Sequence, residues 1–135
     1  MIKFLCFYKK TILIILLIII ASLANFENVD TTEMQKIPHL DKIVHFCMYL
    51  TLTFTFMWEN YSRHKYHFIL SRFIIIILLV ASIGVMLEIF QATLTQTRSG
   101  NIADAAANSV GLIFGMVLFR VSKTNEFIKT KIFKV

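Results

Sequence analysis

The chain has 135 residues, of which 57% are hydrophobic and 16% are charged, and its formal net charge is +6. A soluble domain carries about 25% charged residues, so this composition argues against an ordinary soluble protein. Because the chain contains only one Pro and four Gly, disorder is expected to be confined to short stretches. The composition therefore indicates a membrane protein.

Four apolar segments follow in chain order and predict four transmembrane helices, at about 11–26, 43–58, 73–90 and 102–121. Apolar and polar residues do not alternate in them, which excludes the strands of a lipid-embedded barrel. Sixteen residues of helix cover about 24 Å, less than a hydrocarbon core of about 30 Å, so polar or snorkelling residues are expected at the ends. The predicted fold class is all-α, a polytopic bundle of four transmembrane helices. It forms a single membrane domain over 1–135 and ends in a basic tail at 122–135.

The first segment has two interpretations. Residues 1–10 and 11–20 resemble the basic and apolar regions of a secretory signal, and Ser22-Leu23-Ala24 resembles a cleavage site. A retained helix is favoured, because three further apolar segments follow and the polar stretch after Ala24 is too short to form a domain. Cys6 and Cys47 have no partner at zinc-ligand or redox-motif spacing and are interpreted as small membrane-facing side chains.

Lys and Arg are distributed unevenly between the two sides of the expected membrane. The N-terminus, the connection between the second and third segments, and the C-terminal tail carry 11 of the 14 basic residues. The opposite side keeps only Lys36, Lys42 and Arg98. The positive-inside rule places both termini and the middle connection in the cytoplasm. Because the basic residues lie in separate juxtamembrane segments, they indicate contact with anionic lipids and no binding of nucleic acid.

Acidic residues lie at three segment ends that this orientation brings to the outer face. Asp41 precedes the second segment, Glu88 is near the end of the third, and Asp104 is in the first turn of the fourth. An acid at the centre of a membrane helix costs roughly 2.5–3.5 kcal/mol. Three acids at one depth therefore predict a polar site there. The candidate residues of this site are Asp41, Lys42, His45, Glu88, Gln91, Arg98, Asp104 and Asn108.

Helical spacing groups these residues by face. Asp41 and His45 are four apart, and Glu88 and Gln91 are three apart, so each pair shares a face. Asp104, Asn108, Gly111 and Gly115 form one continuous stripe whose GxxxG part allows close helix packing. Glu88 lies near a helix C-terminus, where the helix dipole disfavours an anion. A cationic partner is therefore expected for it, and Arg98 is the nearest candidate along the chain.

Each residue also has a purely structural interpretation. Asp41 and Asp104 could be helix-capping acids stabilised by the dipole. Lys42 and Arg98 could be interfacial residues that snorkel to the head groups. His45 could be a hydrogen-bonded packing residue. The case for a site rests on the convergence of these residues at one face.

Three blocks of the chain resemble VanZ-like membrane proteins. They are Asp41-Lys42-x-x-His45-Phe46-x-x-Tyr49, then Glu88-x-x-Gln91, then Arg98 followed by Asp104, Asn108, Gly111 and Gly115. Their order and spacing cover roughly 41–115. One position departs from the pattern, because Asn101 stands three residues after Arg98, where many members have an acid. The resemblance implies a small multi-pass protein of the bacterial cytoplasmic (inner) membrane, in a family whose founding member is associated with resistance to the glycopeptide teicoplanin.

Three functions stay open. In the first, the site accommodates an amphipathic ligand at the outer leaflet, such as a lipid-linked envelope precursor or a lipoglycopeptide antibiotic, and His45, Arg98 and Lys42 contact its anionic groups. In the second, the protein is an enzyme in which Glu88 or Asp104 acts as general acid or base on a lipid head group. In the third, it is a structural or assembly subunit. A metal held by Asp41, His45, Glu88 and Asp104 is a variant of the second function, but the residues lack a compact ligand motif, so no metal or other cofactor is expected.

Overall fold

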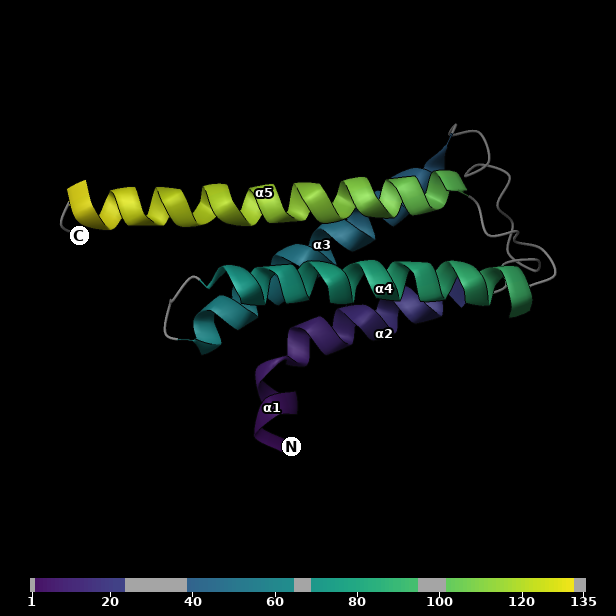
Figure 1. Ribbon diagram of the computed structural model, residues 1–135, viewed down its shortest axis with the longest axis horizontal. Coiled ribbons are helices and arrows are strands. Elements are labelled where there is room, and N and C mark those ends of the chain that lie inside the picture. The colour runs from purple at the N-terminus through teal and green to yellow at the C-terminus, as the bar shows by residue number, and fades with distance from the viewer. Residues whose placement is uncertain (1, 24–38, 65–68, 95–101, 133–135) are drawn as a thin grey trace.

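The computed structural model of the protein describes residues 2–23, 39–64, 69–94 and 102–132. Within these ranges the chain folds into five helices and contains no strand. They are α1 (Ile2–Phe7), α2 (Lys9–Leu23), α3 (Leu40–Arg63), α4 (Leu70–Leu94) and α5 (Ile102–Ile132). The expected all-α fold class is therefore confirmed for the described residues. Figure 1 shows α2, α3, α4 and α5 as long helices packed along one another, with the short α1 turned away from α2.

The helices extend beyond several of the apolar segments that predicted them. α3 begins before 43 and continues past 58, and α5 continues from the apolar segment 102–121 to Ile132, so that most of the basic tail at 122–135 is helical. Helices end where capping residues or breakers stop them, and neither Gly nor Pro follows Gly115 in the chain. Hydropathy marks the part of a helix that suits lipid, which is shorter than the helix itself.

Two of the described helices are long and apolar enough to cross a membrane, over Leu70–Thr93 in α4 and Ile102–Thr124 in α5. α2 is described over only 15 residues. α3 is long enough, but its sequence includes four charged residues and several hydroxyl-bearing ones, which lower its hydropathy. Length and composition therefore support α4 and α5 as spans most directly.

The most extensive contact among the described helices is between α3 and α5, and glycine makes their close approach possible. A Cβ atom placed on Gly111 would lie 2.4 Å from the backbone oxygen of Phe46, and one on Gly115 would lie 2.5 Å from the backbone oxygen of Leu50. Real Cβ atoms do not approach a backbone that closely, so any larger residue would separate the helices. The GxxxG part of the α5 stripe thus faces α3.

The exterior of the bundle is apolar, while several buried side chains are polar. Leu78, Val85 and Ile113 are examples of the many large aliphatic residues that are more than half exposed. Among the described residues, the buried polar side chains are Thr11, Ser22, His45, Thr53, Glu59, Asn60, Gln91 and Asn108. A water-soluble protein rarely exposes so much continuous apolar surface. Contact with lipid accounts for this distribution.

Candidate functional site

Three helix ends that carry the candidate residues lie together. α3 and α5 begin, and α4 ends, at the same end of the bundle (Figure 1). This follows from short connections between antiparallel neighbours, because each connection returns the chain to the end where the previous helix finished. We refer to this as the site end of the bundle.

Asn108 joins three helices at the site end. On α5, its Oδ1 lies 3.1 Å from Nδ1 of His45 on α3, and its Nδ2 donates a hydrogen bond of 3.2 Å to Oε1 of Glu88 on α4. The same Glu88 oxygen lies 3.8 Å from His45 Nδ1. The side chains of His45 and Glu88 are 10% and 13% exposed, so the contacts are shielded from solvent. We call these three residues the His–Asn–Glu cluster.

The chemistry of this cluster fixes the protonation of the imidazole. An ionised carboxylate only accepts hydrogen bonds, so the amide nitrogen of Asn108 must face Glu88 and its oxygen must face His45. The amide oxygen also only accepts, so His45 Nδ1 must carry a proton. In the neutral ring Nε2 is then the acceptor. Asn108 therefore sets the tautomer of His45 as well as joining the helices.

Lys42 connects the two remaining acids of the site end. Its Nζ lies 2.9 Å from Oδ2 of Asp41 and 3.5 Å from Oδ1 of Asp104. Asp41 is exposed and does not join the buried cluster, although it is one turn from His45. The hydrogen bond from Lys42 lowers the pKa of the Asp41 carboxyl. Lys42 is thus engaged with carboxylates of the protein itself.

Gln91 contacts a different helix from its neighbour Glu88. Its Nε2 donates a buried hydrogen bond of 3.0 Å to the backbone oxygen of Ser22, in the last turn of α2. Carbonyl groups there lack partners within the helix, so Gln91 fastens α2 to α4. The spacing of three residues placed Gln91 on the face of Glu88, but the structure does not bring it into the His–Asn–Glu cluster. Arg98 lies outside the described residues, so its pairing with Glu88 stays a prediction.

The alternative metal centre does not form in the described part of the chain. No group of three or more His, Cys, Asp or Glu side chains there is arranged to hold a metal ion. Asp41 and Asp104 are held by Lys42, while His45 and Glu88 contact Asn108. The four residues are divided between two sets of contacts.

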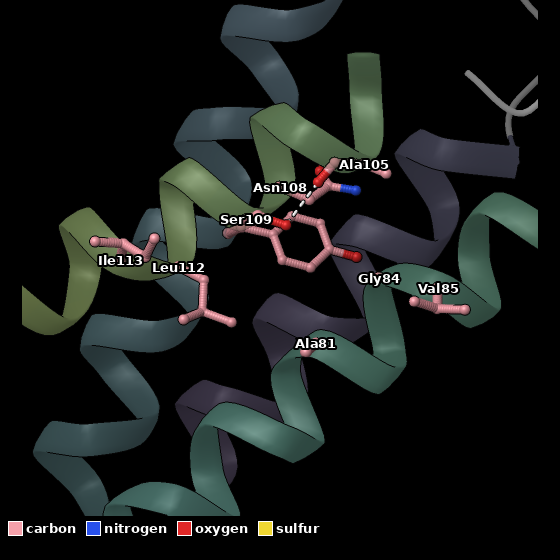
Figure 2. Close-up of a pocket in the computed structure, with 9 residues that line it drawn as sticks. Ala81, Gly84, Val85, Ala105, Asn108, Ser109, Leu112 and Ile113 are labelled. Atoms are coloured by element: carbon pink, nitrogen blue, oxygen red, sulfur yellow. Dashed lines mark hydrogen bonds between the residues drawn. The ribbon is translucent and has the colours of Figure 1, made fainter. Parts of the chain in front are cut away.

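A groove of about 240 Å³ lies beside the cluster, between α4 and α5. Figure 2 shows residues of α4 on one side and residues of α5 on the other. Its lining residues are Tyr49, Ala81, Gly84, Val85, Ala105, Asn108, Ser109, Leu112 and Ile113. Val85 and Ile113 are 59% and 51% exposed, so the groove opens on the apolar exterior of the bundle. Asn108 belongs to both the groove and the His–Asn–Glu cluster.

Two buried polar atoms near the groove lack a hydrogen-bond partner among the described residues. One is the hydroxyl of Tyr49, whose side chain is on α3 and is only 2% exposed. The other is Oε2 of Glu88. A Cβ on Gly84 would lie 3.4 Å from the Tyr49 hydroxyl, so that hydroxyl lies against α4 one turn from Glu88. The combination of apolar walls and unsatisfied polar atoms is typical of a ligand site.

The opposite end of the bundle contains a polar contact that the sequence analysis missed. Oε1 of Glu59 accepts a hydrogen bond of 3.2 Å from the backbone N–H of Lys10, and Oε2 accepts bonds of 3.1 and 2.7 Å from the N–H and hydroxyl of Thr11. These N–H groups belong to the first turn of α2. The N–H groups of a first turn have no acceptor within the helix, and the helix dipole favours an anion there. Glu59 therefore caps α2 from α3. The available signal was the one used for Glu88, an acid near a helix C-terminus that needs a donor elsewhere.

A family model described as VanZ/LLP1 matches residues 4–123. The chain belongs to the VanZ/LLP1 family. The match extends well beyond the three blocks that suggested the resemblance, and it includes the His–Asn–Glu cluster, the groove and Glu59. A search of curated proteins and a search of solved structures each found no match. Membership of the VanZ/LLP1 family and the two span-capable helices identify a membrane protein.

Proposed function

We propose that this VanZ-like protein accommodates an amphipathic ligand at the outer leaflet of the bacterial inner membrane. The ligand's apolar part lies in the groove between α4 and α5, and its head group lies at the site end. The ligand class is a lipid-linked envelope precursor or a lipoglycopeptide antibiotic, which connects the protein with resistance to glycopeptides such as teicoplanin. The proposal includes four transmembrane helices with both termini in the cytoplasm, so that the site end faces outwards.

The observation that supports the proposal most strongly is the form of the groove. It is open to the side on a surface suited to lipid, its walls are largely aliphatic, and Asn108 and the Tyr49 hydroxyl provide polar groups. A chain molecule already in the bilayer could enter it without crossing water. A subunit that used its polar residues only to connect helices would have no need of such an opening.

Native mass spectrometry of the protein purified in mild detergent tests the proposal. Ala105 lines the groove and Ala106, the next residue of α5, does not. Ala105→Leu should fill the groove and remove the co-purified amphiphile, whereas Ala106→Leu makes the same change on the exposed surface and should leave it bound. Equal retention of the amphiphile by both variants, each folded by gel filtration, would show that the groove is not its binding site.

A second function, catalysis on a lipid head group, is supported by the contact between His45 and Glu88. An imidazole 3.8 Å from a partly buried carboxylate is a combination used for general acid–base chemistry. The two functions give different results when isolated protein is incubated with the co-purified amphiphile. Binding leaves its mass unchanged, whereas an enzyme converts it to a product, and the conversion stops in His45→Ala.

A further inference from the structure

The groove and the charges at the site end also indicate what kind of head group fits there. We infer that the ligand bears a primary ammonium group, whose N–H donors and positive charge are both recognised. The inference rests on the proposed function and makes it more specific. Three observations carry it, and each concerns a different property of the site end.

The first observation is hydrogen-bonding capacity. Tyr49 lines the groove and is only 2% exposed, yet its hydroxyl has no hydrogen-bond partner among the described residues. Buried polar groups are almost always paired in folded proteins. Glu88 Oε2, one turn along α4 from the place where Tyr49 meets Gly84, is likewise buried without a partner in this part of the chain. An ionised carboxylate only accepts, and a phenol accepts as well as donates, so a ligand with several N–H donors satisfies both atoms.

The second observation is charge. The described residues of the site end include the acids Asp41, Glu88 and Asp104, and the one ammonium group among them, on Lys42, is within 3.5 Å of both Asp41 and Asp104. Glu88 has the amide of Asn108 and the imidazole of His45 as its described neighbours. Among the described residues no Lys or Arg contacts Glu88, so a ligand cation would compensate its charge, as the alternative to the predicted pairing with Arg98, while a phosphate in the same position would be repelled by it.

The third observation is the position of these groups relative to the lipid-facing surface. Ala81, Leu112 and Ile113 provide apolar walls next to the polar atoms, and the exposed rim leaves room for an acyl chain. A free amine in water would gain little from such walls. An amine attached to an acyl chain would use both parts of the groove, so the occupant is an ammonium-bearing amphiphile.

Matched single-chain lipids provide the test. Lysophosphatidylethanolamine and lysophosphatidylcholine with the same acyl chain share the phosphate and the positive charge, but the second has methyl groups in place of the N–H donors. Lysophosphatidylglycerol offers hydroxyl donors without the positive charge. Titration of the full-length wild-type protein in nanodiscs, followed by native mass spectrometry, should give affinity for the ethanolamine lipid at least about fivefold above either of the others, which corresponds to the loss of one typical hydrogen bond.

Two variants assign this preference to residues. Glu88→Gln removes the charge and should bring the ratio of ethanolamine to glycerol affinity towards one, whereas Tyr49→Phe removes the hydroxyl and should bring the ratio of ethanolamine to choline affinity towards one. Equal affinities of the wild-type protein for the ethanolamine and choline lipids would overturn the inference, as would equal or tighter binding of the glycerol lipid. If all three bind with equal affinity and Ala105→Leu abolishes binding, the proposed function stands although the head-group inference fails. If none binds the wild-type protein, both fail.

Discussion

Asn108 is the residue that makes three helix ends into one site. It satisfies a carboxylate with its nitrogen and an imidazole with its oxygen, so no residue with a single type of hydrogen-bonding group can replace it. In a buried environment this pair of hydrogen bonds stabilises the fold more than it would in water. A buried group that loses its partner is shielded from water and has no other hydrogen bond to compensate for that desolvation. Asparagine is therefore a chemically specific choice at this position.

Exchange of the two polar groups tests this role. Asn108→Asp places a second carboxylate against Glu88 and should lower the free energy of unfolding by about 1–3 kcal/mol, the usual cost of an unsatisfied buried polar group. Adding Glu88→Gln restores a donor–acceptor pair with the groups reversed, so the double variant should recover much of the loss in a detergent unfolding assay. Ser109→Ala is the control, since that exposed hydroxyl donates to the backbone oxygen of Ala105 within its own helix. If the losses in unfolding free energy from Asn108→Asp and Glu88→Gln simply added in the double variant, the contact between residues 108 and 88 would be ruled out.

Gly111 determines how closely α3 and α5 pack. Gly111→Ala puts a methyl group into the backbone of α3 at Phe46 and should lower the free energy of unfolding by about 1–3 kcal/mol, as overpacking does elsewhere. Gly84→Ala is the matched control, because its methyl group would meet the ring of Tyr49 at 3.3 Å and a side chain can shift by a few tenths of an ångström. Thermal unfolding in detergent measures the stability of both variants. Equal losses would mean that the α3–α5 distance does not depend on glycine.

The cap between α3 and α2 gives a second prediction about elements. Glu59→Ala removes all three hydrogen bonds to the first turn of α2 and should lower the free energy of unfolding by about 1–3 kcal/mol. Thr11→Val removes only the hydroxyl bond and should cost less. Protease protection of the N-terminal segment, measured together with thermal unfolding, shows whether α2 has detached. If Thr11→Val were as harmful as Glu59→Ala, the backbone bonds would contribute nothing.

At the scale of the whole molecule, the unequal distribution of basic residues predicts the orientation. Cys6 and Cys47 are free and exposed, so the test needs a background in which both are replaced by Ser. In that background Asp30→Cys and Thr95→Cys should react with a membrane-impermeant maleimide in intact cells. Lys65→Cys and Lys129→Cys should react only after permeabilisation. Labelling of Lys65→Cys in intact cells would reverse the orientation and move the site end to the cytoplasmic face.

The sequence was informative wherever the evidence was local. The stripe from Asp104 to Gly115 is periodic, so its inward face could be predicted, and the all-helical fold followed from four apolar segments without strand-like alternation. The direction of Gln91 could not be predicted, because it depends on where α2 lies around α4. Glu59 was missed because its partners are 48 and 49 positions away along the chain. The groove could not be predicted either, because it depends on the distance between α4 and α5, which the sequence does not give.

The cap formed by Glu59 has a consequence for synthesis of the protein. The first turn of α2 leaves the ribosome before residue 59 has been added, so its N–H groups initially have no carboxylate to bind. α2 can form as a helix at that stage, but the cap at its first turn cannot form until the far end of α3 has been made. Assembly of the bundle therefore includes a docking step that follows formation of α2. A chain truncated before Glu59 would contain α2 without that anchor.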